Sequence, residues 1–258
     1  MKNSGEWKRK LKNPLLFTAI LSPVIIVACL ITTIYAFSIL AEEMKIKVQA
    51  EMGYNLFILV GTIQSAIIAF LCSFFGYILA EKTGLLKPFC FEKSKLIKTI
   101  IVTIVGGILF SLDYWTFGRV IPTLQELTKL TITVNAIFAS ILYGGIVEEL
   151  LLRLFMMSLL VFVLWKLFYR KIGAEQIPPG IYIVANVLAA ALFAAGHLPA
   201  TAGAFGELTP LLIFRCFLLN GAFGIIFGCL YKKYGIQYAM AGHAGFHIIS
   251  KIIWFVFI

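Results

Sequence analysis

The chain alternates long apolar runs with short charged segments. Residues 15–41 and 54–80 contain no charged side chain. Each is long enough to cross roughly 30 Å of hydrocarbon, which takes about 20 helical residues. Shorter uncharged runs, some separated by single charges, cover residues 100–112, 131–147, 154–165, 180–196 and 216–231. This pattern predicts an all-α, polytopic transmembrane helical bundle of about seven or eight spans, which forms a single membrane domain over residues 1–258.

Proline and glycine mark the expected ends of the later helices. The Pro-Pro-Gly run at 178–180 should begin the fifth span, and Pro210 should begin the sixth, because proline suits the first turn of a helix. Gly235 should end the sixth span. Within that span, Gly224 and Gly228 form a GxxxG pattern, which permits close contact between membrane helices but also fits the general abundance of glycine in this chain.

The segment 131–165 is too long for one upright span. At 1.5 Å per residue it would reach roughly 50 Å, so the helix must tilt, kink or break. Gly144 and Gly145 are the expected point of flexure. Glu148 and Glu149 follow three and four positions after Gly145 and should therefore lie near the middle of the membrane.

Charge is sparse and unevenly placed. Hydrophobic residues make up 61% of the chain and charged residues 13%, with a formal net charge of +10, a composition that excludes a soluble globular protein. Basic residues collect before the first span and at 82–98, 166–171 and 232–233, whereas 41–55 and 198–209 are poor in them. The positive-inside rule then predicts a multi-pass protein of the cell membrane with a cytoplasmic N-terminus. Because the basic residues are spread over four segments, nucleic-acid binding is not expected.

Three ionisable residues interrupt an apolar region in the sequence VEELLLR, residues 147–153. A charge at the centre of a bilayer costs about 2.5–3.5 kcal/mol on insertion scales, so such residues are usually functional or paired. Glu149 and Arg153 are four positions apart and share a helix face, so we expect them to pair. Glu148 lies about 100° around the helix and has no obvious partner, which leaves it free to act as a general base.

All three histidines of the chain, His197, His243 and His247, lie in apolar segments of its C-terminal third. A single histidine in a membrane helix often only bonds a neighbouring helix. Three of them, together with Glu148, predict one shared site. His243 and His247 share a helix face, and Phe193 shares a face with His197, where its ring can wall a pocket.

Three ordered motifs resemble those of the CPBP intramembrane protease family, which includes the type II CAAX prenyl endopeptidases and bacteriocin-immunity-type proteins. EELLLR (148–153), FAAGH (193–197) and HAGFH (243–247) correspond to the family patterns EExxxR, FxxxH and HxxxN or HxxxD. The resemblance covers residues 135–250, which would form the catalytic core of the domain. One position departs from the pattern, because His247 stands where the family has asparagine or aspartate.

The resemblance implies a CAAX-protease-like intramembrane endopeptidase that attacks a peptide bond with an activated water. Glu148 would activate the water with His197 as its partner, and His243, together with His247, would stabilise the oxyanion. Three histidines and a glutamate can also ligate zinc, so His197, His243 and His247 are candidate ligands of a metalloprotease. The chain contains no HExxH motif, and the sequence leaves the zinc-dependent and the metal-free mechanism both open.

The remaining polar residues are expected to support the site or the bundle. Glu149, Arg153 and Phe193 would hold the site together. Arg215, which interrupts an apolar run, fits either a structural role or a contact to a substrate carboxylate. Two others, Asp113 and Asn220, are expected at span ends or in helix packing.

Two other classes of function stay open beside the protease. The expected partners of a protease are the lipid bilayer and a peptide or membrane-protein substrate. A catalytically idle member of the family would instead bind a peptide or a partner protein, as in bacteriocin immunity. A transporter would use the same buried glutamate and histidines as a proton relay, but the chain shows no inverted repeat, which makes this reading the weakest.

Overall fold

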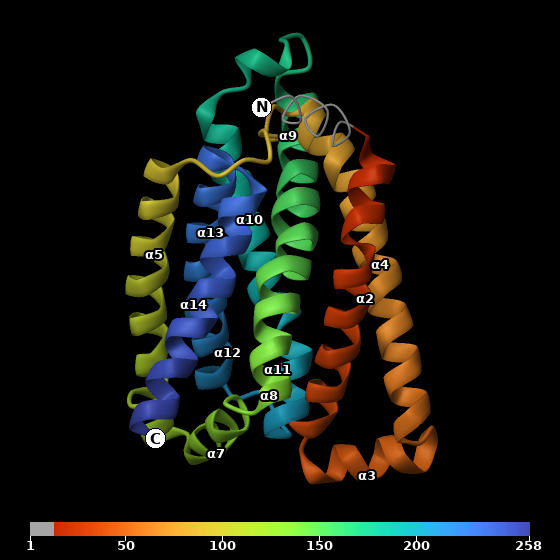
Figure 1. Ribbon diagram of the computed structural model, residues 1–258, viewed down its shortest axis with the longest axis vertical. Helices are drawn as coiled ribbons and strands as arrows, with labels where there is room; N and C mark the ends of the chain where they lie inside the picture. The colour runs from red at the N-terminus through yellow and green to blue at the C-terminus, as the bar shows by residue number, and fades with distance from the viewer. Residues whose placement is uncertain (1–12) are drawn as a thin grey trace.

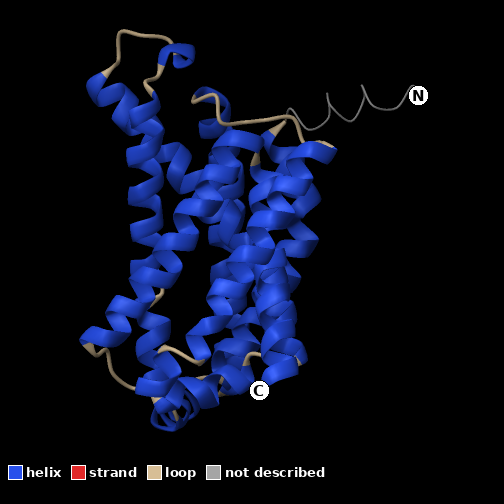
Figure 2. Ribbon diagram, turned by 90° about the vertical axis from the view of Figure 1, so that its left-hand side faces the viewer, coloured by secondary structure: helices blue, strands red, loops and turns tan. Residues whose placement is uncertain are grey.

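The computed structural model describes residues 13–258, which consist of helices and loops without a strand, as Figure 2 shows. Seven helical stretches of these residues are long and apolar enough to cross a membrane: Pro14–Ser38, Tyr54–Lys82, Lys93–Val120, Val134–Phe168, Pro179–Phe205, Pro210–Tyr234 and Ile236–Phe257. The predicted all-α bundle of membrane-spanning helices is therefore confirmed. Of the basic residues expected to fix the N-terminus in the cytoplasm, those at 2–12 lie outside the described residues.

Some spans are single helices, and others are built from several pieces. The single helices are α2 (Pro14–Ser38), α4 (Tyr54–Lys82) and α14 (Ile236–Phe257). The third span joins α5 (Lys93–Ser111), the short η1 (Leu112–Tyr114) and α6 (Phe117–Val120). The fifth joins α10 (Pro179–Gly196) and α11 (Leu198–Phe205), and the sixth joins α12 (Pro210–Cys216), η5 (Phe217–Gly221) and α13 (Ala222–Tyr234). Shorter connecting helices are α3 (Glu42–Glu51), α7 (Pro122–Leu130) and η4 (Ala174–Gln176).

The spans form an upright bundle whose two ends differ (Figure 1). Helix α2 packs on α4 at one side, and α5 packs on α14 at the other. The loops 83–92 and 169–178 lie at the upper end in Figure 1, which we call the lysine-rich end because basic residues flank both loops. Helices α3 and α7 and the C-terminus lie at the lower end, which we call the opposite end.

The predicted helix boundaries agree with the structure at three positions. Pro179 occupies the first turn of α10, and Pro210 occupies the first turn of α12, where the missing proline N–H removes no helical hydrogen bond. The hydroxyl of Thr209 also accepts a hydrogen bond from the Leu212 N–H at 3.2 Å, which caps α12. Gly235 ends α13 with a φ of 115°, a conformation that residues with a Cβ rarely adopt.

The GxxxG pattern of the sixth span lies at a helix contact. A Cβ atom at Gly224 would lie 3.0 Å from the Cβ of Ala190 on α10, and one at Gly228 would overlap Asn186 of the same helix. Asn186 in turn donates a hydrogen bond from Nδ2 to the Ile225 carbonyl oxygen at 3.0 Å. Close approach of α10 and α13 therefore requires both glycines, which decides between the two readings of the pattern.

The fourth span, Val134–Phe168, remains helical over its full length. It begins with α8 (Val134–Phe138), ends with α9 (Ser158–Phe168), and widens between them into two π-helical segments, η2 (Ala139–Val147) and η3 (Leu150–Met157). Gly144 and Gly145 lie within η2, where a Cβ on Gly145 would be 2.6 Å from the Ala244 Cβ of α14. The expected point of flexure is thus a place of close contact with α14, and π-helical turns of this kind often occur at functional sites.

Candidate active site

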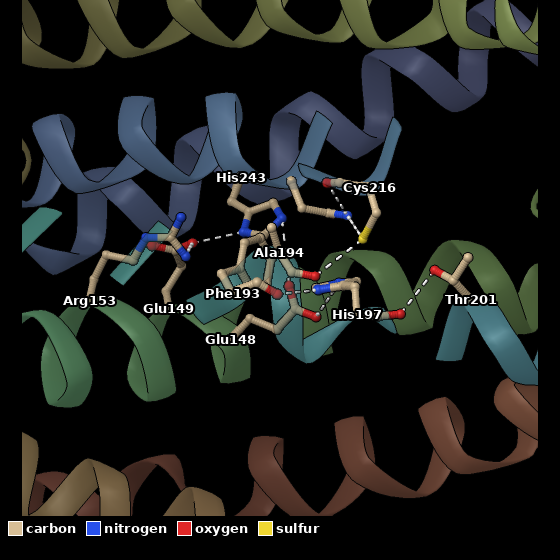
Figure 3. A network of polar contacts seen from close by, with 10 residues as sticks. Glu148, Glu149, Arg153, Phe193, Ala194, His197, Thr201, Cys216 and His243 are labelled. Atoms are coloured by element: carbon tan, nitrogen blue, oxygen red, sulfur yellow. Dashed lines mark hydrogen bonds and ion pairs between the residues drawn. The ribbon is translucent and has the colours of Figure 1, made fainter. Parts of the chain in front are cut away.

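Glu148 lies between two histidines at the centre of the bundle (Figure 3). One carboxylate oxygen is 3.9 Å from His197 Nε2, and the other is 3.9 Å from His243 Nε2. These distances are longer than a direct hydrogen bond. The Glu148 side chain keeps 17% of its surface exposed, so its carboxylate reaches open space inside the bundle.

Glu149 points to the other side of the helix and is fully buried. Its Oε1 atom lies 3.0 Å from Arg153 Nη1, as expected from their spacing, and 2.8 Å from His243 Nδ1. The contact with His243 could not be expected from the sequence, because the two residues are 94 positions apart. It joins Arg153, Glu149 and His243 into one buried polar chain that ends at Glu148.

Arg153 is held on several sides. Its Nη2 donates a hydrogen bond to the Gly224 carbonyl oxygen at 3.0 Å. The guanidinium also lies 5.2 Å from the ring centre of Phe193 and 5.6 Å from that of Phe227, within the range of cation–π attraction. These contacts fix the arginine and, through the ion pair, the carboxylate of Glu149.

His197 is placed at the end of α10, where the chain turns into α11. Its Nδ1 lies 2.9 Å from the carbonyl oxygen of Phe193, and its ring meets the Phe193 ring edge to face at 4.4 Å. Thr201 donates its hydroxyl hydrogen to the His197 carbonyl oxygen at 2.9 Å. The predicted shared face of Phe193 and His197 is present, and it directs Nε2 of the histidine toward Glu148.

His243 and His247 present stacked rings from α14. Their ring centres are 5.0 Å apart at an interplanar angle of 29°, and the His243 ring also stacks on Phe227 at 4.4 Å. Gly144 leaves the room for this arrangement, because a Cβ there would lie 3.1 Å from His247 Nε2. His247, which stands where the family pattern has asparagine or aspartate, thus packs beside the site.

The partners of the two Nδ1 atoms assign the proton positions on His197 and His243. A backbone carbonyl and a carboxylate only accept hydrogen bonds, so both Nδ1 atoms must donate. In the neutral rings, each Nε2 atom is then an acceptor that faces the carboxylate of Glu148. Three acceptors facing one another need a shared donor, which a water molecule or an added proton supplies.

A cavity of about 210 Å³ contains all four predicted catalytic residues, Glu148, His197, His243 and His247. The other polar side chains of its wall are Thr32, Tyr35, Ser140, Tyr143 and Asn220. Tyr143 precedes Glu148 by one π-helical turn, since the Glu148 N–H bonds the Tyr143 carbonyl oxygen. Residues five positions apart share a face in a π-helix but not in an α-helix, so the sequence alone did not indicate that Tyr143 lies beside Glu148. Asn220 donates to the Cys216 carbonyl oxygen at 3.1 Å and was expected only in packing.

The arrangement does not fit the candidate zinc ligands. No group of three or more His, Cys, Asp or Glu side chains in residues 13–258 is placed to hold a metal ion. Ligands about 2.0–2.1 Å from a tetrahedral zinc would lie roughly 3.4 Å apart. The distances from Glu148 to both histidines are 3.9 Å, and His247 stacks on His243 instead of turning toward the same point.

A second buried ion pair lies toward the opposite end of the bundle. Arg215 of α12 donates from Nε to Asp113 Oδ1 at 2.8 Å and from Nη2 to Asp113 Oδ2. Asp113 belongs to η1, so the two-pronged contact joins the third and sixth spans. The structural reading of Arg215 therefore agrees with the structure, and Asp113 has a specific partner where the sequence indicated only a span end.

Residues 130–249 match the family of type II CAAX prenyl endopeptidases described as Rce1-like. The matched segment contains all three motifs, so the predicted resemblance to this family is confirmed for that part of the chain. At the level of the family, this match suggests a CAAX-protease-like intramembrane peptidase. No curated protein and no solved structure matches the chain.

Proposed function

We propose that this protein is an intramembrane endopeptidase in which Glu148 activates a water molecule. The observation that supports this most directly is the convergence of the Glu148 carboxylate with Nε2 of His197 and Nε2 of His243, each 3.9 Å away, on the wall of one cavity. A water between Glu148 and His197 would donate one hydrogen to each. Both bonds raise electron density on the water oxygen, which makes it the nucleophile.

Charge balance favours one further proton in this cluster. Glu148 and Glu149 carry two negative charges, and Arg153 carries one positive charge. A proton on His243 Nε2 brings the sum to zero, which suits the low dielectric of the membrane interior. The carboxylate of Glu149, 2.8 Å from Nδ1, stabilises the resulting imidazolium.

The reaction then proceeds in two steps. In the first, Glu148 takes a proton from the water while the water oxygen forms a bond to the carbonyl carbon, and the carbonyl oxygen becomes negative. His243 donates its Nε2 hydrogen to this oxyanion, with His247 beside it. In the second, Glu148 returns the proton to the amide nitrogen, the C–N bond breaks, and the oxyanion collapses to the C=O of a carboxylic acid. This acid then loses its remaining proton to the released amine, which gives a carboxylate and an ammonium group.

Glu149, Arg153 and Phe193 act on the reaction only through other residues. Glu149 holds the ring of His243, Arg153 holds Glu149, and Phe193 packs against both Arg153 and His197. We assign the whole catalytic core to residues 135–250 of one membrane domain. The substrate is a peptide or a membrane protein. None of the contacts described above depends on a prenyl group of the substrate.

The protein is expected to be a multi-pass protein of the cell membrane with its N-terminus in the cytoplasm. The lysines of the described residues support this orientation, since Lys82, Lys87, Lys93, Lys166 and Lys232 all lie at the lysine-rich end. The opposite end carries several acidic residues in α3 and in the segment after α11. The cytoplasm would then face the loops 83–92 and 169–178.

The test is cleavage of a peptide library by purified protein in detergent, with Glu148→Gln as the deciding variant. Glutamine keeps the shape of glutamate but cannot take a proton, so hydrolysis should fall by about 10²–10⁴-fold while the melting temperature stays unchanged. Cleavage by Glu148→Gln at the wild-type rate would overturn the assignment of the base. If the wild type cleaves nothing but still retains a peptide, the binding role of an idle family member is the correct one.

A chelator provides a second test of the same mechanism. Because the described donors do not fit a zinc site, dialysis against EDTA or 1,10-phenanthroline should leave the cleavage rate unchanged. Metal analysis of the purified protein is the matching control. Loss of activity on chelation, restored by zinc, would show that the metalloprotease reading is correct.

A further inference from the structure

Two lysines at the lysine-rich end of the bundle share one aromatic ring. Lys166 of α9 has its Nζ atom 5.8 Å from the ring centre of Phe162 and 3.5 Å from that of Trp165. Lys82, the last residue of α4, has its Nζ atom 6.0 Å from the centre of the same Phe162 ring. These distances lie within the range of cation–π attraction, so the rings hold both ammonium groups near the junction of α4 and α9.

A third lysine joins this group through α10. Lys232, in the last turn of α13, has its Nζ atom 4.6 Å from the ring centre of Tyr182. The Tyr182 hydroxyl donates a hydrogen bond to the Thr83 carbonyl oxygen at 2.8 Å, and Thr83 directly follows Lys82. The three ammonium groups therefore lie along a continuous series of contacts across the ends of α4, α9, α10 and α13. We call these three lysines, Lys82, Lys166 and Lys232, the lysine arc.

The lysine arc has no acidic partner in the part of the chain that the structure describes. No carboxylate of residues 13–258 lies within ion-pair distance of any of its three ammonium groups. The acidic residues of the lysine-rich end are Glu81, Glu92 and Glu175, and Glu92 pairs with Lys95 at 2.6 Å. Basic side chains outnumber acidic ones at this end, so the arc keeps an excess of positive charge.

Other lysines of the protein are neutralised within their own helices. Lys45, Lys95 and Lys129 each pair with a glutamate three positions earlier, at 2.7, 2.6 and 2.9 Å. The contacts of the arc differ, because an aromatic ring attracts an ammonium group without cancelling its charge. An ammonium group has three hydrogens to donate, and these stay available to an anion.

The position of the lysine arc indicates what kind of anion it meets. Its lysines lie in the last turns of α4, α9 and α13, which are membrane-spanning helices, and this places them at the depth of the lipid headgroups. The helix dipoles favour cations there but carry no full negative charge. The next residues along the chain include exposed apolar side chains, such as Leu167 at 68% and Ile183 at 61% exposure, on which acyl chains can lie.

We propose that the lysine arc binds the phosphodiester group of an anionic phospholipid, whose acyl chains lie along the apolar surface of α9 and α10. The phosphate carries the negative charge that the arc lacks, and its oxygens accept the free ammonium hydrogens. Helix α9 continues the span that carries Glu148, and α10 ends before His197. The bound lipid therefore joins the ends of helices that position the proposed active site, and its binding does not depend on hydrolysis.

The experiment measures lipid binding by the purified full-length protein in a neutral detergent. The protein is titrated with fluorescent phosphatidylglycerol and with phosphatidylcholine that has the same acyl chains and label. Each lysine near an anionic lipid contributes about fivefold in affinity, so phosphatidylglycerol should bind at least tenfold more tightly. Inorganic phosphate at the concentration of the lipid should displace none of it. Displacement by phosphate would show a site for free anions and would overturn the assignment to a lipid.

Two triple variants with the same net charge separate a site from general attraction. Lys82→Gln, Lys166→Gln and Lys232→Gln together should abolish most of the preference for phosphatidylglycerol. The matched control, Lys45→Gln, Lys95→Gln and Lys129→Gln together, removes the same charge from lysines that already have partners and should keep the preference. Equal losses in both variants, or no loss in the first, would show that the lysine arc is no binding site.

A fourth variant tests the role of the shared ring. Phe162→Leu keeps every charge but removes the ring that Lys82 and Lys166 share. The affinity for phosphatidylglycerol should fall about two- to fivefold, as expected for loss of cation–π attraction at an exposed site. The affinity for phosphatidylcholine should stay the same. A parallel fall for both lipids would mean that Phe162 supports only the apolar surface, which would contradict the proposed arrangement.

Discussion

Two buried arginine–carboxylate pairs stabilise this bundle, and they differ in what each pair touches. Arg153 and Glu149 lie on one helix, and Glu149 also binds His243, whose other nitrogen faces Glu148. Arg215 and Asp113 lie on different spans, 102 positions apart, and satisfy one another through a two-pronged contact. The first pair is therefore connected through His243 to the wall of the cavity, whereas the charged groups of the second pair contact each other.

The difference separates two uses of buried charge. A pair such as Arg215 and Asp113, whose charged groups contact each other, fixes the distance between two helices and contributes to stability alone. A pair that shares its carboxylate with a histidine also fixes the position and charge of that ring. Substitutions in the first pair should therefore change both stability and hydrolysis, whereas substitutions in the second should change stability alone.

The largest expected effect is that of Glu149→Gln. It leaves Arg153 and His243 without their shared carboxylate, and breaking a fully buried pair costs about 3–5 kcal/mol. The free energy of unfolding in detergent should fall by this amount, and activity should be lost. The double variant Glu149→Gln, Arg153→Gln should recover part of the stability. A stable but inactive Glu149→Gln protein would show that the pair is no structural support.

The next effect isolates the connection between the pair and the cavity. His243→Gln leaves Glu149 with Arg153 and can still donate a hydrogen bond to Glu149, but it cannot become a cation. Hydrolysis should fall by about 10²–10³-fold, as for loss of an oxyanion donor. The melting temperature should change far less than in Glu149→Gln. Equal losses of stability in the two variants would contradict the division of roles.

A smaller effect is expected from Asp113→Asn. The Arg215 side chain is 16% exposed, so its charge is partly solvated when the partner is removed. Loss of the charge-assisted hydrogen bonds should lower the free energy of unfolding by about 1.5–3 kcal/mol. The turnover number of the detergent-solubilised enzyme should remain within about twofold of wild type. A much larger fall in turnover with normal stability would place this pair in the active site.

The smallest effect is expected from an exposed pair. Lys129 and Glu126 lie 2.9 Å apart on α7, and the hydrogen bond to Glu126 raises the pKa of Lys129. The pair therefore stays formed at neutral pH and is lost only as the pH rises through this raised pKa. Because both side chains are exposed, Lys129→Gln should change neither melting temperature nor activity measurably. A clear change would mean that α7 contacts the substrate.

Local spacing was enough to predict the contacts that lie within one helix. The ion pair of Glu149 and Arg153 and the edge-to-face contact of Phe193 and His197 both follow from four-residue spacing, because such positions share a face in any helix close to the α form. The number of spans followed from the uncharged runs, and Pro179, Pro210 and Gly235 marked their ends.

Contacts between distant segments were beyond the sequence. The bond between His243 and Glu149 depends on how α14 lies against the fourth span, and the pairing of Asp113 with Arg215 depends on how η1 meets α12. The π-helical turns before Glu148 also escaped prediction, since no residue pattern in 139–147 announces a shift from four- to five-residue bonds. Because of these π-helical turns, Tyr143 lies on the cavity wall together with Glu148.

The sequence by itself determined the membrane bundle, the resemblance to the family and the candidate site residues, because hydrophobic length, motif order and helical spacing are local properties of the chain. Only the tertiary structure decided that Glu149 also contacts His243, 94 positions away, and that Glu148 faces a cavity lined by all three histidines. Both outcomes depend on how helices pack, and packing is set by contacts between side chains that are remote in sequence.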